Sequence, residues 1–125
     1  MIKVVLLISG GAIGTLARYS VSGAIHRWLG SSFPMGTLAV NIIGSFIIGF
    51  LWGLFEREYL SPNVRSFLFI GVLGGFTTFS SFSLETFNLF REGETKWAIL
   101  NILANNLIGL LMVFAGLILA RAIKN

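Results

Sequence analysis

A polar face is the first chemical feature of the segment Gly36–Phe55. Thr37, Asn41 and Ser45 stand four residues apart in this otherwise apolar stretch, so a helix places all three on one side. Residues of this kind commonly hydrogen-bond to neighbouring helices in a membrane. The Asn41 carboxamide, however, also has two N–H donors for a passing anion. We therefore predict that this face, with Thr37 and Asn41, lines a polar pathway.

The segment Gly71–Glu85, GVLGGFTTFSSFSLE, is the most informative part of the chain. Gly, Thr and Ser crowd into the middle of an apolar span there, which predicts a break in the helix near Gly74 to Thr77. A break frees backbone groups from their intrahelical partners, which is tolerated at membrane depth only beside protein or water. Freed carbonyls suit a small hard cation such as Na⁺.

Two phenylalanines in the same segment, Phe79 and Phe82, stand three residues apart beside the Ser80 and Ser81 hydroxyls. The ordinary role of Phe in a membrane helix is packing or lipid contact. The edge of an aromatic ring nevertheless carries a partial positive charge. Two inward ring edges together with hydroxyl groups could hold a small anion without any full positive charge in the pathway.

Three asparagines, Asn101, Asn105 and Asn106, fall in the last apolar segment. Asn101, Asn105 and Gly109 repeat the four-residue spacing of the earlier polar face. Carboxamides in a membrane helix are costly unless hydrogen-bonding partners meet them. We expect Asn105 to extend the polar pathway.

The remaining composition argues against an enzyme and against a nucleic-acid-binding protein. The chain has no Cys, no Asp and one His, which leaves little for thiol or hydrolytic chemistry. Its net charge of +4 could suggest nucleic acid, but most of the cations stand at the ends of apolar segments. Membrane flanks explain that placement better.

Helices that cross a bilayer are needed to position these residues. The 125-residue chain is 55% hydrophobic and 11% charged, against roughly 25% charged residues in soluble domains. Three uncharged runs approach or exceed the roughly 20 residues that span a bilayer, and a fourth is long enough if Arg18 snorkels or faces protein. We predict an all-α membrane protein with one domain over residues 1–125 and helices at about Lys3–His26, Gly36–Phe55, Val64–Phe90 and Thr95–Arg121. A cleaved signal peptide is a poorer interpretation, because the rest of the chain is equally apolar.

The positive charges are almost evenly divided between the two sides of the predicted bundle. Five cations fall on one side and three on the other, or four if Arg18 counts: Lys3, Arg57, Arg65, Arg121 and Lys124 against Arg27, Arg91 and Lys96. So small a bias barely selects an orientation under the positive-inside rule. The chain could therefore insert both ways and pair with an inverted copy, while a single orientation stays an open alternative.

The string GGFTTFSSFSLE closely resembles the GGxTTFSTFSxE signature of the Fluc (CrcB) fluoride channels. The runs GTLAVNIIGSFIIG, NILANNLIGLLMVFAG and GGAIGTLARY are similar to the second, fourth and first helices of that family. The likeness covers all four predicted helices, and its third-helix string is highly specific. Fluoride as the ion follows from this resemblance alone.

The resemblance implies an antiparallel, dual-topology homodimer in a prokaryotic plasma membrane, with two pores that let fluoride leave the cytoplasm passively and so confer fluoride resistance. By motif position, Asn41 would line the pore, Phe79 and Phe82 would present their edges to fluoride, Ser80, Ser81 and Glu85 would continue the polar path, and Arg18 would lie near the vestibule. The carbonyls of Gly74 and Thr77 would bind a structural Na⁺ at the dimer interface. The chain departs from the family at Ser81, where Thr is usual, and at Asn105, where Ser is common.

Two other functions stay open from the residues alone. A small, dual-topology, proton-coupled multidrug exporter needs a membrane-embedded carboxylate in its first helix, and none stands between Met1 and Gly30. Glu85 is the only acid within an apolar span, and it lies near the end of the third helix. A purely structural helix bundle predicts no flux of any ion.

Overall fold

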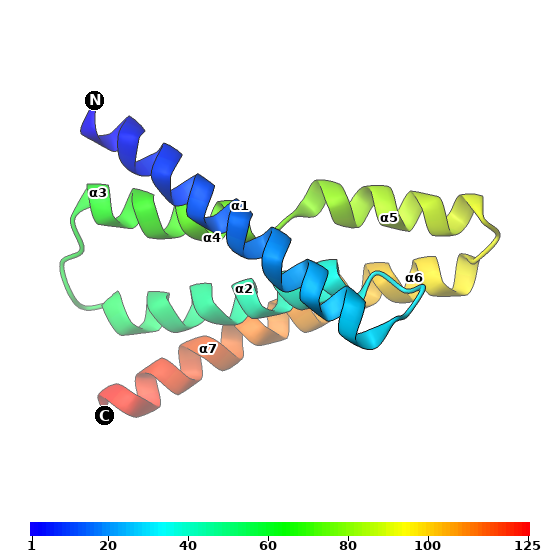
Figure 1. Cartoon of the computed structure of the whole chain (residues 1–125). Coiled ribbons are helices and arrows are strands. Elements are labelled where there is room, and N and C mark those ends of the chain that lie inside the picture. The colour runs from blue at the N-terminus through cyan, green and yellow to red at the C-terminus, as the bar shows by residue number, and fades with distance from the viewer.

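A computed structural model describes residues 1–125 as four long helical segments, two of which are interrupted (Figure 1). In chain order the elements are α1 (Ile2–Leu29), α2 (Met35–Phe55), α3 (Pro62–Arg65), the π-helical turns η1 (Ser66–Val72), α4 (Leu73–Phe76), α5 (Phe79–Arg91), α6 (Thr95–Leu103), the π-helical turn η2 (Ala104–Ile108) and α7 (Gly109–Lys124). The four segments contain 28, 21, 30 and 30 residues and are apolar enough to cross a membrane. The prediction of four membrane-spanning helices is confirmed, and each predicted end lies within three residues of the observed one.

The connections between the segments are short and carry residues that end or begin helices. Gly30 ends α1 in the left-handed region, at φ 58°, and its N–H donates to the carbonyl of His26. Ser61 begins α3 by accepting a hydrogen bond from the N–H of Val64, with Pro62 in the first turn. Gly93, at φ 79°, turns the chain between α5 and α6. These local signals explain why the segment ends could be predicted.

The third segment breaks at Thr77 and Thr78, which are extended rather than helical. Thr78 begins α5, because its hydroxyl oxygen accepts a hydrogen bond from the N–H of Ser81 at 3.1 Å. Figure 1 shows α4 and α5 joined by a thin connection near the middle of the bundle, where α1 crosses. The predicted break in the third helix is confirmed, but it lies at Thr77 and Thr78, whereas Gly74 is still helical in α4. The break places irregular backbone near the middle of the segment.

Glycines allow the helices to approach one another closely. A Cβ atom at Gly14 of α1 would overlap the carbonyl oxygen of Val72, and one at Gly49 of α2 would overlap that of Val113 in α7. Gly10 lies against Gly71 in the same way. Because these residues are small, α1 lies directly on the first half of the third segment, and α2 lies directly on α7.

One end of the bundle carries both termini and the connection between α2 and α3 (Figure 1). Arg121 of α7 binds the Glu56 carboxylate there through two hydrogen bonds of 2.6 and 3.0 Å. This hydrogen bonding by Arg121 lowers the pKa of Glu56, so the pair is lost as the pH falls through that lowered value. Lys124 donates to the carbonyl of Leu54 at 2.7 Å. The charged ends of α2 and α7 are thus tied together at the membrane boundary.

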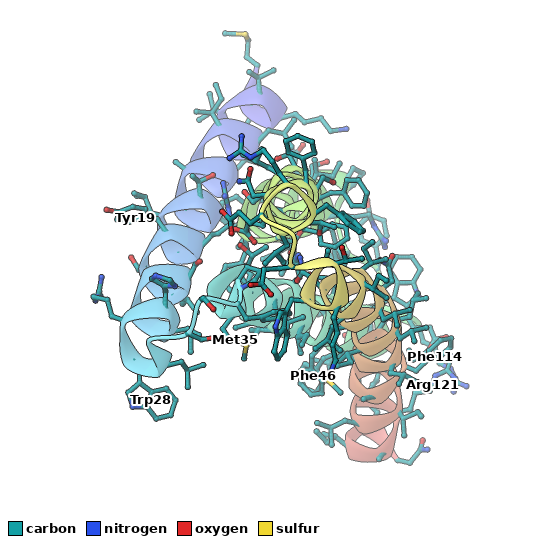
Figure 2. The ribbon with its side chains drawn as sticks, turned by 90° about the vertical axis from the view of Figure 1, so that its right-hand side faces the viewer. Tyr19, Trp28, Met35, Phe46, Phe114 and Arg121 are labelled. Atoms are coloured by element: carbon teal, nitrogen blue, oxygen red, sulfur yellow. The ribbon has the colours of Figure 1, made fainter.

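The outer surface of the bundle is strongly apolar, because only 21 of 125 residues are buried within the single chain and many large hydrophobic side chains are exposed. Figure 2 shows Tyr19, Trp28 and Phe114 pointing away from the helices. Tyr19 and Trp28 are 80% and 81% exposed. An apolar surface of this extent must contact lipid or another copy of the chain.

Candidate functional site

Two cavities meet at the break in the third segment. The first, here called the phenylalanine groove, has a volume of about 360 Å³ and lies between α2, the third segment and η2. The second, the vestibule, has a volume of about 570 Å³ and lies between α1, α2 and α5. Thr78 lines both cavities. The extended backbone of the break therefore lies between two open cavities that polar side chains help to line.

Asn41 of α2 restores the backbone hydrogen bonds that the break removes. Its Oδ1 accepts from the N–H of Thr78 at 2.8 Å, and its Nδ2 donates to the carbonyl of Thr78 at 3.1 Å. The same Nδ2 donates to Oδ1 of Asn105 at 2.9 Å. Asn41 lines the phenylalanine groove, but both of its amide hydrogens already have acceptors. The expectation that these donors are open to an anion is therefore wrong for this structure.

The asparagines of the fourth segment find partners in turn. Nδ2 of Asn105 donates to Oδ1 of Asn101 at 3.0 Å, and Nδ2 of Asn101 donates to the Thr86 hydroxyl at 2.9 Å. Thr86 donates to the carbonyl of Phe82 at 2.8 Å. Asn105 lines the phenylalanine groove, whereas Asn101 is only 1% exposed and lies behind it. The π-helical turn η2 brings Asn106 to the groove as well.

Phe79 and Phe82 come together in the groove at the start of α5. Their ring centroids are 5.3 Å apart with an angle of 62° between the planes, so the edge of one ring meets the other. Phe82 is 6% exposed, whereas Phe79 is 75% exposed and lies on the open side of the groove. The two rings thus sit in different environments despite their equivalent positions in the motif.

The neighbouring serines point in different directions. Ser81 lines the vestibule, while the Ser80 hydroxyl lies 3.4 Å from that of Thr78 and lines neither cavity. Neither serine lines the groove, so the expectation that both hydroxyls lie beside the ring edges there is wrong for this structure. Ser83, also exposed, donates to the carbonyl of Phe79 at 2.9 Å and lines neither cavity.

The vestibule collects the charged residues of the site. Arg18 of α1 donates its Nε–H to the carbonyl of Gly75 at 3.0 Å, which satisfies one of the free carbonyls at the end of α4. Thr37 of α2 donates to Oε1 of Glu85 at 2.7 Å, and Oε2 of Glu85 has no partner. Arg18, Thr37 and Glu85 thus lie together in the vestibule, not in the phenylalanine groove.

Two backbone carbonyls at the break have no hydrogen-bond donor. Those of Gly74 and Thr77 accept none of the backbone bonds made outside the helices and none from a side chain. Gly74 is exposed, and a Cβ added there would meet only the carbonyl oxygen of Phe69, at 3.9 Å. Oxygen atoms of this kind are suitable ligands for a small hard cation.

Sequence reasoning missed two residues that line the cavities and one residue behind them. Thr78 joins the two cavities, and its position before a helix, three residues ahead of Ser81, is a recognisable capping pattern. His26 lines the vestibule at the end of α1. Thr86 carried no signal, because its partner Asn101 is 15 residues away and on another helix.

The chain is similar to known proteins over nearly its whole length. Residues 5–117 match the family model described as "CrcB-like protein, Camphor Resistance (CrcB)". A protein of Parabacteroides distasonis is 56% identical over 123 residues, which cover 98% of this chain and 96% of that protein. A protein of Magnetococcus marinus is 48% identical over 115 residues, which cover 91% of this chain and 94% of that protein. A protein of Pyrococcus abyssi is 51% identical over 117 residues, which cover 93% of this chain and 94% of that protein. All three are named "Fluoride-specific ion channel FluC".

Proposed function

Since the chain belongs to the CrcB family, we propose that it is a fluoride channel through which fluoride passively leaves the cytoplasm, and that it thereby confers fluoride resistance. The protein is a multi-pass membrane protein of a prokaryotic plasma membrane. The observation that carries the proposal is the near-full-length likeness to relatives named as fluoride-specific ion channels. The activity is ion transport rather than a chemical reaction.

The vestibule and the phenylalanine groove form the proposed route. The charge of Arg18 attracts an anion into the vestibule, and Thr78 leads from there to the groove. Fluoride is small and strongly hydrated, so its water must be replaced by protein groups with partial positive charge. Hydroxyl groups and the edges of Phe79 and Phe82 supply that charge without a full cation that would hold the ion too tightly. Larger anions are excluded by the diameter of the groove.

Asn41 acts on this route chiefly by holding the break open in a defined shape. Its donors serve Thr78 and Asn105, so fluoride would have to displace one of those acceptors to bind the amide directly. The ring edges are therefore the principal contacts of the ion in the groove. This assignment refines the pore-lining role that the motif implies for Asn41.

A second, inverted copy completes each pore in this proposal. The single chain leaves the groove open beside the exposed side chain of Phe79. An antiparallel partner would cover that side, and two-fold symmetry then produces two pores per dimer. The nearly even division of positive charge between the two ends supports insertion in both orientations.

A structural Na⁺ is proposed where the two breaks cross. The carbonyls of Gly74 and Thr77 lack donors in the single chain, and Gly74 is exposed to an approaching partner. Two carbonyls from each copy would surround the ion with backbone oxygen. The ion would stabilise the dimer without entering the fluoride route.

Efflux from liposomes tests the proposed function. The purified protein is reconstituted in vesicles loaded with potassium fluoride, and release is started with valinomycin and followed with a fluoride electrode. We expect rapid release of fluoride and none of chloride from matched potassium chloride vesicles. Protein-free vesicles serve as the control. No fluoride release, or release of a lipophilic cation driven only by a pH gradient, would reject the channel and favour the exporter.

A further inference from the structure

Five hydrogen bonds behind the phenylalanine groove donate in a single direction. They run from Thr78 N–H to Asn41 Oδ1 at 2.8 Å, from Asn41 Nδ2 to Asn105 Oδ1 at 2.9 Å, from Asn105 Nδ2 to Asn101 Oδ1 at 3.0 Å, from Asn101 Nδ2 to Thr86 Oγ1 at 2.9 Å, and from Thr86 Oγ1 to the Phe82 carbonyl at 2.8 Å. We name this chain the carboxamide relay. It begins and ends next to the two phenylalanines.

We propose that Asn101 and Thr86, which line no part of the ion route, are positioning residues that set the shape and selectivity of the phenylalanine groove through this relay. The proposal rests on the proposed fluoride channel. Asn101 is 1% exposed and Thr86 7% exposed, and neither borders the groove or the vestibule. Any influence they have on an ion must therefore pass through other residues.

The direction of each bond follows from the one before it. The backbone N–H of Thr78 can only donate, so Asn41 must turn Oδ1 toward it and Nδ2 toward Asn105. Asn105 must then present Oδ1 to Asn41, which leaves its Nδ2 to donate to both Oδ1 and the backbone carbonyl of Asn101. Asn101 in turn presents Nδ2 to Thr86, whose own hydrogen goes to the Phe82 carbonyl. Reversal of one amide would place donor against donor or acceptor against acceptor at its neighbour.

The relay holds α5 at two points that bracket the phenylalanine pair. Thr78 is the residue before Phe79, and the carbonyl of Phe82 is in the first turn of α5. Between Thr78 and Thr86 of the third segment, the intermediate residues Asn41, Asn105 and Asn101 belong to α2 and to the fourth segment, so the relay joins three segments of the bundle. Hydrogen bonds aligned in one direction polarise and strengthen one another. Loss of the Thr86 hydroxyl is therefore expected to loosen the amides as far away as Asn41.

The relay also decides which groups the groove offers to an ion. While it is intact, both amide hydrogens of Asn41 are occupied and the ring edges are the main positive contacts. A loosened relay lets the Asn41 and Asn105 amides rotate and lets Phe82 shift with its backbone. The groove then admits a larger, more weakly hydrated anion such as chloride.

Three variants separate positioning from packing. Thr86→Val keeps the side-chain shape but removes the hydroxyl, so Asn101 loses its acceptor. Thr86→Ser restores the hydroxyl. The double variant Thr86→Val/Asn101→Leu removes both partners, which avoids an unpaired buried amide and recovers stability while the relay stays broken. Ser83→Ala is the matched control, because Ser83 also bonds the carbonyl four residues earlier but is exposed and connects to nothing further.

Fluoride and chloride efflux are measured for each variant, with gel filtration and thermal unfolding in detergent as folding controls. We expect fluoride efflux to fall about tenfold, and chloride release to become measurable, in Thr86→Val and in the double variant. Thr86→Ser and Ser83→Ala should match the wild type. Wild-type flux and selectivity in the double variant would overturn the proposal, as would equal losses in Ser83→Ala. If Thr86→Val alone fails to fold, the double variant and Thr86→Ser decide the result.

Side-chain amide resonances provide a readout that does not depend on fluoride transport. In ¹⁵N-labelled protein in detergent micelles, Thr86→Val should shift the Asn41 Nδ2 signals, whereas Ser83→Ala should leave them in place. Unmoved Asn41 signals in Thr86→Val would show that the relay transmits nothing. A wild-type protein that releases no fluoride but shows these shifts would reject the channel while retaining the relay.

Discussion

The side chain of Asn41 replaces the two backbone partners that Thr78 loses where the third helix breaks. Three hydrogen bonds converge on one carboxamide, two to the break and one to Asn105. A carboxamide is the shortest side chain that can donate and accept in the geometry of a peptide group. This need explains why Asn, rather than a hydroxyl residue, stands at the centre of the polar face of α2.

Asn41→Asp should therefore abolish conduction. Aspartate has nearly the same shape, but it cannot donate to Thr78 or Asn105 and brings negative charge beside two acceptors. Each acceptor left without its donor costs about 1–3 kcal/mol, and the charge repels an anion in the groove. Fluoride efflux is expected to drop at least about a hundredfold, with reduced thermal stability of the purified protein. Normal efflux in Asn41→Asp would remove this residue from the route.

Substitutions at the phenylalanine pair distinguish an ion route from a packing surface. If the ring edges hold fluoride, Leu or Ile at Phe79 removes the positive edge and should cut efflux by orders of magnitude. Because Phe79 is 75% exposed, that replacement should hardly change the stability of the single chain. Met is a useful further substituent at either position, since it fills space without restoring the electrostatics.

Phe82 is buried, so its replacements need a folding control. Phe82→Leu should lower efflux as strongly as the change at Phe79, together with a modest loss of stability from the smaller side chain. Gel filtration identifies variants that still assemble. Wild-type efflux in well-assembled Leu variants at both positions would place the ion path elsewhere, along Asn41 and Asn105.

Helix α1 and the first half of the third segment are held together by direct backbone contact. Gly14→Ala would drive a methyl group into the carbonyl of Val72, so the two helices would have to separate. We expect a loss of about 1–3 kcal/mol in unfolding free energy and lower efflux, because Arg18 and the break would shift together. Gly11→Ala, one turn away in open space, should change stability by no more than about 1 kcal/mol. Equal effects at Gly11 and Gly14 would contradict this packing.

The insertion of the whole molecule in both orientations can be tested through its weak charge bias. A tag at Met1 should be labelled on both sides of the membrane. Adding three Lys to the connection between α2 and α3 should force one orientation and lower activity, because fewer inverted partners remain. Co-expression of this Lys variant with a variant biased toward the opposite orientation should restore activity. One-sided labelling of the unmodified chain would reject dual topology.

Sodium is expected to stabilise the assembled molecule rather than the single chain. A cation bound by both copies favours the dimer by linkage. Dimer lifetime in detergent and fluoride efflux should both fall when Na⁺ is replaced by N-methyl-D-glucamine, with time allowed for exchange. Identical dimer stability and efflux in the two cations would exclude the proposed site at Gly74 and Thr77.

Much of the fold and some of the site were predictable from local signals. A bilayer requires long apolar helices with satisfied backbones, so uncharged runs and turn residues such as Gly30 and Pro62 delimit the four segments. The crowding of Gly, Thr and Ser likewise indicates the break. The Phe79–Phe82 spacing identifies the aromatic pair without any knowledge of the tertiary structure.

Tertiary packing alone decided which donors and acceptors meet. The sequence determined that Asn41, Asn101 and Asn105 needed partners, but those partners come from other helices, as far away as 64 residues for Asn41 and Asn105. The packing of α2, α5 and the fourth segment gives both Asn41 donors their acceptors and makes Thr86 the partner of Asn101. It also places Ser81 in the vestibule. Helix periodicity fixes the face on which a side chain lies, whereas only the packed bundle fixes what it touches, because a hydrogen bond requires atoms within about 3 Å of each other.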